Sequence, residues 1–513
     1  MWDDCGYFPE TTINVLCLMS MVKLENDKVL RMHDQLRDLG REIVRQEDLE
    51  NPKLRSRLWD GQEASDVFEE CMITEKVQLL NLDVATCEHD KFAERSKLRY
   101  LQIDKAKLVV GDFKHRLLNL RWLRWRYSPL DFEATNFHMK KLVILDLRGS
   151  TIPENWKGWS QIKMASNLKV LDISFTQIRE LPDEIRMLKK LEIIDAHYSE
   201  LTGIRSLPTS IHTLGLGSCY YVEALPELPS SLQVLRVHLG RLHVTPNLAN
   251  LVNLQELQCY QIPDKMKQII FSDIVKLYKL HRLDVECSNI MTLPKEIDAL
   301  SRLKFLSLEK CVKLQCILGL PPNLVRLNIR CGLSLEMLSA LSNLKLLSEL
   351  RLYECVKLTK IQGLGKLQSL TSLRIEKCIE LIEIEGLGNL ELLESLEIDQ
   401  CIELKEIQGL GNLVSLASFY MGWCFNIAEL DLLECSAHLA SSEMSGYRHP
   451  ENKPDRSNLN KLTKIEVVSC KNLNKIEGLH ILVSLEYLNL SYCSSMVRMP
   501  NLSNLKMLRR LRL

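Results

Sequence analysis

The sequence predicts an α/β solenoid, in which many short repeats each add one strand to a long parallel sheet. Three observations predict it: a nine-residue pattern, LxxLxLxxC, recurs along the chain, neighbouring copies stand 23 residues apart, and glycines recur in step with them. Four consecutive copies occupy Leu347–Cys355, Leu370–Cys378, Leu393–Cys401 and Leu416–Cys424.

The alternation within the motif predicts how the copies associate. Side chains alternate across a strand, so the leucines of LxL point inward and the residues between them point outward. One copy cannot bury its own leucine face, but a stack of copies can. The pattern therefore predicts a leucine-rich-repeat horseshoe with the parallel sheet on its concave face. Further strands open at Leu98, Leu120, Leu142, Leu168, Leu191, Ile211, Leu232, Leu254, Leu280, Leu303, Leu324, Leu462 and Leu485.

The ninth motif position carries a small hydrogen-bonding side chain, which we expect to close the turn after each strand. Its residues are Cys219, Cys311, Cys355, Cys378, Cys401, Cys424, Cys470 and Cys493, with Ser150, Thr176, Ser199 and Ser288 elsewhere. A metal or disulfide ladder is the competing interpretation, which we reject because the cysteines should point into the core in parallel and no histidine accompanies them. Glycines eight residues after a motif cysteine predict turns on the convex side, at Gly363, Gly386, Gly409 and Gly478.

Upstream of Leu347 the spacing between copies varies, and between Leu416 and Leu462 it is 46 residues, or two periods of 23. We therefore expect an eroded repeat around Leu439–Tyr447, followed by an exposed loop rich in Ser, Pro, Asn and charge.

Composition limits the kinds of partner. The chain has 66 basic and 66 acidic residues, so its formal charge is zero and no long-range field attracts nucleic acid. The most apolar early stretch, Ile13–Val22, is about half the length that spans a bilayer. We expect no nucleic acid, no membrane span and no metal, and the 17 scattered cysteines indicate a reducing compartment.

The first fifty residues predict a different kind of structure. Residues 10–24 predict a helix and a strand, 25–28 a turn, and 29–32 a second strand. Met32–Asp48 then predicts an amphipathic helix with Leu36, Leu39, Ile43 and Val44 on one face. So short a segment has too small a core to stand alone, and we expect it to be the end of a larger domain. Both ends of the chain look truncated.

Several longer stretches carry a resemblance to a known family. They are RMHDQLRDLGREIVRQE at 31–47, RSRLWD at 55–60, FKHRLLNLRWLRWRYSPL at 113–130 and NFHMKKLVILDL at 136–147. These resemble the junction between nucleotide-binding region and repeats in plant intracellular immune receptors that have an N-terminal TIR domain. The resemblance covers nearly the whole chain and implies a fragment of a disease resistance protein, in the cytoplasm or the nucleus.

The resemblance also divides the chain. It implies a partial winged-helix end of a nucleotide-binding region at 1–50, a linker and capping segment at 51–94, and repeats at 95–430. A degenerate repeat and loop at 431–458 and further repeats at 459–513 follow.

In that family the MHD motif helps to hold ADP, which implies a nucleotide contact for Met32, His33 and Asp34 if a nucleotide domain is present. The alternative is that the three residues merely cap and start a helix. This chain contains no phosphate-binding GxxxxGK[ST] loop, so we expect no cofactor in it, and ADP or ATP only in the full-length family. No HExxH or GxSxG motif occurs either, so we expect no catalytic residues and no enzyme.

Binding is expected on the outward strand positions, where the core does not dictate the side chain. Aromatic side chains there supply contact area at little entropic cost. The protein-binding candidates are Trp122, Arg124, Arg126, Phe305, Tyr353, Tyr420, Trp423, Tyr487 and Tyr492, with Tyr127 beside the first three. For the N-terminal cluster, the family resemblance implies the alternative of a contact with the receptor's own nucleotide-binding domain.

Charged residues also alternate on the outward strand positions. Arginines at 326, 330, 351 and 374 alternate with acids at 349, 376, 397 and 399, and cross-strand pairing is the simplest explanation.

The leading functional hypothesis is a receptor fragment that binds a protein ligand, such as a pathogen effector, and regulates a nucleotide switch. The alternative is an intracellular scaffold for signalling proteins.

Overall fold

The computed structural model describes residues 9–19, 21–24, 30–70, 72–84, 86–94, 96–104, 108–127, 131–137, 139–152, 158–433, 458–496 and 500–513. The chain forms two compact units, Met1–Pro246 (unit 1) and Asn247–Leu513 (unit 2).

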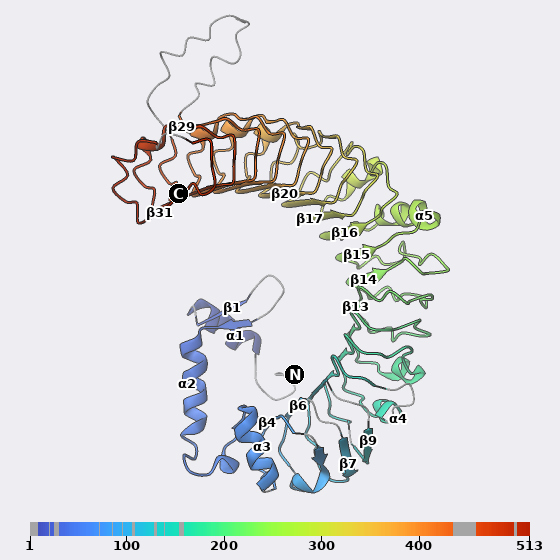
Figure 1. Cartoon of the computed structure of the whole chain (residues 1–513). Coiled ribbons are helices and arrows are strands. Elements are labelled where there is room, and N and C mark those ends of the chain that lie inside the picture. Colours follow the sequence, from blue (N-terminus) through green and yellow to red (C-terminus); the bar gives the residue numbers. More distant parts are fainter. Residues whose placement is uncertain are drawn as a thin grey trace, which may run out of the picture. The chain divides into compact units, whose positions relative to one another are not determined.

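Unit 1 begins with the helix, hairpin and helix that the sequence predicts (Figure 1). Helix α1 (Pro9–Leu18) is followed by β1 (Val22–Leu24) and β2 (Leu30–Met32), which pair antiparallel, and by α2 (Asp34–Arg45). Val44 is buried, but Leu39 and Ile43 on the expected apolar face are 56% and 61% exposed. Helix α3 (Gly61–Glu70) packs on β4 and buries Phe68.

A ladder of parallel strands makes up the rest of unit 1, each strand pairing with the next. The strands are β3 (Arg57–Leu58), β4 (Leu79–Leu82), β6 (Tyr100–Asp104), β8 (Trp122–Arg126), β10 (Ile144–Asp146), β11 (Val170–Asp172), β12 (Ile193–Asp195), β13 (Thr213–Leu216) and β14 (Val234–His238). The first two lie in the segment predicted as linker and cap, so the ladder begins earlier than the motif indicates. A second parallel sheet contains β5 (Thr86–Glu88), β7 (Leu108–Asp112) and β9 (Asp131–Thr135), and α4 (Gly158–Ile162) precedes β11.

Unit 2 continues the same architecture, with its ladder strands along the inner side of a curved row (Figure 1). They are β15 (Glu256–Tyr260), β16 (Arg282–Glu286), β17 (Phe305–Glu309), β18 (Arg326–Arg330), β20 (Glu349–Tyr353), β22 (Ser372–Glu376), β24 (Ser395–Asp399), β26 (Ser418–Gly422), β28 (Lys464–Val468), β30 (Tyr487–Asn489) and β31 (Arg510–Arg512). Helix α5 (Asp264–Ile274) lies on the outer side (Figure 1). Short parallel pairs join β19 (Met337–Leu338) to β21 (Lys360–Ile361), β23 (Glu383–Ile384) to β25 (Glu406–Ile407), and β27 (Glu429–Asp431) to β29 (Lys475–Glu477).

The core consists of the inward motif positions. In β22 and its flanks Leu370, Leu373, Ile375 and Cys378 are all 0% exposed, and burial of one such leucine side chain stabilises the fold by about 2 kcal/mol. The predicted leucine-rich-repeat solenoid with a parallel sheet is therefore confirmed.

The cysteines close the turns as predicted. The Cys401 thiol donates to the Ile375 carbonyl of the preceding strand at 3.7 Å. Burial raises the pKa of this thiol to about 12, so it stays protonated and able to donate. No cysteine within the described ranges forms a disulfide.

The turn glycines also have the predicted conformation. The φ angles of Gly363, Gly386, Gly409 and Gly478 are 81°, 78°, 77° and 77°. Each begins a single 3₁₀ turn, and a Cβ on Gly386 would lie 2.9 Å from the backbone nitrogen of Gly365 in the preceding repeat. The close stacking of repeats thus requires glycine at this position.

Two predictions about the repeats are wrong. Ser288 does not close its turn: it is exposed, and Cys287 is buried instead, because β16 keeps its alternation from Val285 to Cys287. The 46-residue gap does not add a strand to the ladder, because β26 pairs directly with β28 through Ser418 and Lys464. The expected eroded repeat at Leu439–Tyr447 lies outside the described residues.

Candidate functional site

Motif positions 3, 5 and 7 form the outward face of each ladder strand. In β22 these positions are Ser372, Arg374 and Glu376, which are partly exposed, whereas positions 4 and 6 between them are buried. Neighbouring strands pair in register, so residues of one motif position form a row across the ladder. The candidate site is therefore an extended surface of three rows.

The N-terminal candidates occupy these three positions of β8. The Trp122 ring meets Tyr100 edge to face, with centroids 5.0 Å apart. Arg126 donates to the Asp146 carboxylate at 2.8 Å, and Arg124 lies 3.6 Å from the same group. Both guanidiniums are thus already paired within the ladder.

Asp146 is the centre of this cluster. It is only 3% exposed and also receives a contact from Arg148 at 3.2 Å. Burial opposes ionisation of Asp146, but Arg126 and Arg148 outweigh it and hold the pKa of the carboxyl below its usual value. The N-terminal cluster is therefore an internal ion network more than an open binding surface.

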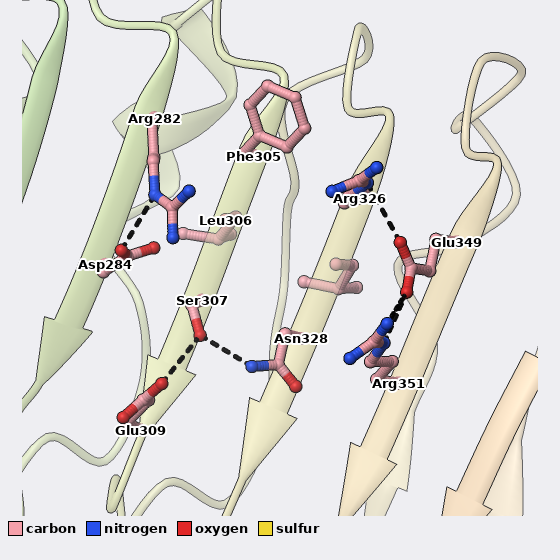
Figure 2. A pocket seen from close by; sticks show the side chains of 11 residues that line it. Arg282, Asp284, Phe305, Leu306, Ser307, Glu309, Arg326, Asn328, Glu349 and Arg351 are labelled. Carbon is pink, nitrogen blue, oxygen red and sulfur yellow. Dashed lines mark hydrogen bonds and ion pairs between the residues drawn. The ribbon is translucent and has the colours of Figure 1, made fainter. Parts of the chain in front are cut away.

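In unit 2, Phe305 lies in the wall of a cavity of about 210 Å³ on the outward face of β16, β17, β18 and β20 (Figure 2). Arg326 stacks over the Phe305 ring at 5.4 Å and pairs with Glu349 at 2.9 Å. Arg351 pairs with the same Glu349 carboxylate. The predicted cross-strand pairing is thus confirmed here, as it is for Arg374 with Glu397 at 3.4 Å.

Tyr353 lies at the end of β20 and holds two cations. Arg330 stacks over its ring at 5.2 Å, and the Lys377 ammonium lies 4.8 Å from the ring centroid and 2.7 Å from the hydroxyl. Phe305 and Tyr353 therefore both support arginines of the strand between them, β18.

Tyr420 and Tyr487 lie on outward positions of β26 and β30. The Tyr420 hydroxyl is 3.3 Å from Asp399, and burial together with that carboxylate raises the pKa of Tyr420 to about 12. Lys464 lies 5.7 Å from the centroid of the Tyr487 ring.

Trp423 and Tyr492 do not project from strands, which corrects the sequence prediction. Each follows its strand at motif position 8, with φ of 53° and 64°. They are 48% and 79% exposed. In this left-handed turn the side chain leaves the outward rows and lies at the rim of the ladder.

Sequence reasoning missed this rim entirely. Position 8 is left-handed in most repeats of both units, and in unit 1 it carries Phe175 and Tyr198, whose rings stack at 5.0 Å. The signal was present in the sequence as aromatic residues directly before the ninth position. The polar floor of the cavity, Ser307 and Asn328, was also missed (Figure 2).

The three MHD residues start helix α2. The Nδ1 atom of His33 accepts from the backbone nitrogen of Gln35 at 3.3 Å, and Asp34 pairs with Arg37 at 3.0 Å. Met32, His33 and Asp34 are all exposed. The capping role is therefore present in the structure, and the exposed imidazole adds one polar group at the helix N-terminus.

The described part of the chain contains no cluster of three or more His, Cys, Asp or Glu side chains suited to a metal ion. Among the helices in the same residues, none is long and apolar enough to cross a membrane.

Comparisons with known proteins agree with the predicted resemblance to plant disease resistance proteins. Residues 1–48 match the family model of the Roq1-like disease resistance protein winged-helix domain. Over 376 residues the chain is 26% identical to disease resistance protein RRS1B of Arabidopsis thaliana, a match that covers 63% of this chain and 27% of RRS1B. The chain also shares 29% identity over 226 residues with disease resistance protein RPV1 of Vitis rotundifolia, covering 37% of this chain and 16% of RPV1. The resemblance is thus confirmed, and this chain spans about a quarter of the length of RRS1B.

Among solved structures, a TLR13–ssRNA13 complex aligns with 88% of this chain and 82% of its own, at 17% identity and a TM-score of 0.41. At that score the similarity carries no argument about what this chain binds.

Proposed function

We propose that this chain is the recognition part of a plant disease resistance receptor, whose repeats bind a protein ligand such as a pathogen effector. The observation that carries the proposal is the outward face of unit 2, where Arg326, stacked on Phe305, lines a cavity and a second stacked pair, Arg330 on Tyr353, lies on the same strands β18 and β20. Similarity to resistance proteins over 63% of the chain supports the same function. Such a surface suits the binding of a protein ligand, and this function requires no catalytic residue.

The proposal includes regulation of an ADP/ATP switch in the complete receptor. Leu39 and Ile43 of α2 are more than half exposed, and apolar residues of this kind favour a contact with further protein surface. His33, exposed at the N-terminus of α2, has the chemistry to donate one hydrogen bond to a phosphate oxygen. In the complete receptor, bound ADP or ATP would distinguish the resting state from the active state. A ligand that binds the repeats more tightly in the active state would shift the population toward that state.

Recognition is tested in leaf tissue with the full-length receptor. We expect Phe305→Ala with Tyr420→Ala to abolish the cell-death response to pathogen strains that the unchanged receptor recognises. Leu392→Ala is the matched control, because Leu392 is 51% exposed and lies outside the outward rows. An unchanged response in the double variant contradicts recognition through this face.

The switch is tested by His33→Ala in the same receptor. We expect weaker ADP retention after purification and a response without pathogen, whereas a capping role alone lowers only helix stability. Capture of the same host signalling proteins from challenged and unchallenged leaves would favour the alternative function, an intracellular scaffold. A fluorescent fusion tests the proposed location in the cytoplasm or nucleus.

A further inference from the structure

Charges on the outward face of unit 2 are segregated along the ladder. Strands β18 and β20 carry three arginines against one glutamate, a formal charge of +2, at Arg326, Arg330, Arg351 and Glu349. The preceding strands β16 and β17 carry one arginine against three acids, a charge of −2, at Arg282, Asp284, Glu286 and Glu309. The following strands β22 and β24 also carry −2, at Arg374, Glu376, Glu397 and Asp399. A basic centre thus lies between two acidic flanks.

The basic centre has more donors than acceptors. Arg326 and Arg351 share the Glu349 carboxylate, although each guanidinium has five N–H groups and a carboxylate accepts about four hydrogen bonds. Glu349 is 15% exposed at its side chain, whereas the side chains of Arg326 and Arg351 are 52% and 49% exposed. The remaining N–H groups therefore face the cavity and solvent, where an anion would complete them.

The geometry holds these donors in place before any ligand arrives. The Arg326 guanidinium carbon lies 5.4 Å from the centroid of the Phe305 ring, and its Nε pairs with Glu349, so two contacts position the group while its terminal nitrogens can donate to an anion. On the cavity floor, the Asn328 amide donates to the Ser307 hydroxyl at 2.9 Å, and Ser307 donates to Glu309 at 3.4 Å (Figure 2). The Ser307 hydroxyl and one N–H of the Asn328 amide are thus used within the protein, and the two arginines supply the charged donors for an anion.

We propose that this cavity binds the carboxylate of an aspartate or glutamate side chain in an extended segment of the protein ligand, with Arg326 and Arg351 as donors. The inference rests on the proposed receptor function and specifies the ligand. Adjacent strands lie about 4.8 Å apart, so each acidic flank is centred about 10 Å from the basic centre. A segment in the extended polyproline II conformation covers that distance in about three residues and returns its side chain to the same side every third residue. The segment that fits therefore has a basic residue three positions before and three positions after the acid.

A carboxylate suits the site better than a phosphate. A phosphate ester carries nearly two negative charges at neutral pH, whereas a carboxylate carries one. The incoming anion must lie near Glu349 and Glu309, which line the same cavity. Like charges at short range oppose the second charge.

The test uses the full chain and a fluorescein-labelled peptide, Lys-Gly-Gly-Glu-Gly-Gly-Lys, followed by fluorescence anisotropy at low salt. We expect binding that weakens about tenfold when the central glutamate becomes glutamine. The charge-reversed peptide, Glu-Gly-Gly-Lys-Gly-Gly-Glu, should not bind measurably. Equal binding of all three peptides overturns the inference, and so does a phosphoserine-centred peptide that binds more than tenfold tighter.

Variants tie the binding to the cavity. Arg326→Ala and Arg351→Ala should each weaken binding of the glutamate peptide about tenfold, and Phe305→Leu about threefold, because a charge-assisted hydrogen bond is stronger than a stacking contact. Arg302→Ala is the matched control, because Arg302 is an exposed arginine outside the cavity. Unchanged circular dichroism verifies the fold of each variant.

Failure of this inference is separable from failure of the receptor function. Peptide binding in solution requires no pathogen and no nucleotide switch. If Arg326→Ala and Arg351→Ala bind the glutamate peptide as the unchanged chain does, the carboxylate site is wrong. The leaf experiment with Phe305→Ala and Tyr420→Ala then decides the receptor function independently.

Discussion

Strands β10 to β12 of unit 1 and β20 to β24 of unit 2 have the same ladder but use motif position 5 in opposite ways. In unit 1 the position carries Asp146, Asp172 and Asp195 in register, and arginines close over the nearly buried Asp146. In unit 2 it carries Arg351, Arg374 and Glu397, with both arginines more than 40% exposed. The outward face therefore stabilises the ladder in unit 1 and is available for binding in unit 2.

The inward positions and the turns of the two regions differ as well. Its repeats at Leu347 to Cys424 have constant length, buried cysteines at position 9 and left-handed glycines in the outer turn. The repeats of β10 to β12 have varied lengths and use Ser150, Thr176 and Ser199 instead. The outward ion pairs of the regular repeats in unit 2 involve arginines that are 41% to 52% exposed at their side chains, whereas Asp146 in unit 1 is nearly buried.

The largest expected effect is that of Asp146→Ala. It removes the carboxylate from three guanidiniums in a nearly buried site, and we expect a loss of about 3 kcal/mol in the free energy of unfolding. Glu349→Ala in unit 2 should cost about 1 kcal/mol, because its arginine partners are half exposed. Urea unfolding of both variants measures the difference, and equal losses would contradict the comparison.

Gly409→Ala tests the regular turns of unit 2. At φ of 77°, an added Cβ would lie 2.8 Å from the Gly388 backbone, so we expect a loss of about 2 kcal/mol from the left-handed conformation and the overlap. Gly40→Ala in α2 is the matched control, because a Cβ there meets nothing within 4 Å. The control should keep or raise the melting temperature, since alanine favours a helix.

Asp146 of unit 1 and Glu376 of unit 2 should respond to acid with opposite sign. The pKa of Asp146 is lowered, so its stabilising effect is complete above its ordinary value of 3.8 and is lost as the pH falls through the folded-state pKa. The penalty of Asp146→Asn should therefore be large at pH 7 and shrink below pH 3.8.

For Glu376 the direction reverses. Burial, and then the charges of Glu397 and Asp399, raise the pKa of Glu376 above 4.5, so its ionised form is unfavourable in the folded chain at neutral pH. Glu376→Gln should raise the melting temperature slightly at pH 7, with no gain below pH 4.5. Melting curves across pH measure both variants, and a gain for Glu376→Gln that persists in acid would refute the assignment.

The smallest effects concern the left-handed rim. Phe175→Ala should cost about 1 kcal/mol, because it removes the stacked contact with Tyr198. Tyr492 is 79% exposed, so Tyr492→Ala should change the free energy of unfolding by less than about 0.5 kcal/mol. Thermal unfolding of the two variants side by side checks the order, and a reversed order would show that exposure does not rank these residues.

Much of the fold was predictable, because burial imposes the same requirement on every repeat. The inward leucines, the position-9 cysteines such as Cys401 and the left-handed glycines such as Gly409 were all found from spacing. The prediction for Ser288 failed because position 8 of this repeat, Cys287, lacks the left-handed turn of its neighbours, so the alternation of the strand continues to Cys287 and buries it. The prediction of a further ladder strand in the 46-residue gap failed because a spacing of two periods does not show whether the intervening segment adds a strand to the ladder.

The candidate site was predicted less completely. Aromatic residues were found by type, but Trp423 and Tyr492 were assigned to strands, because the left-handed turn at position 8 has no glycine to mark it. Arg326 and Phe305 stand 21 positions apart in the sequence, and only stacking of the strands brings the guanidinium over the ring.

Local patterns of residues were enough to predict the repeat, the parallel sheet, the buried thiols and the resemblance to disease resistance proteins. Which arginines are enclosed and which remain open depends on the stacking of the strands and could not be predicted from those patterns. Charge partners are chosen across strands, from residues about one repeat apart, so the same alternation of arginine and acid yields a closed network around Asp146 and an open one beside Phe305.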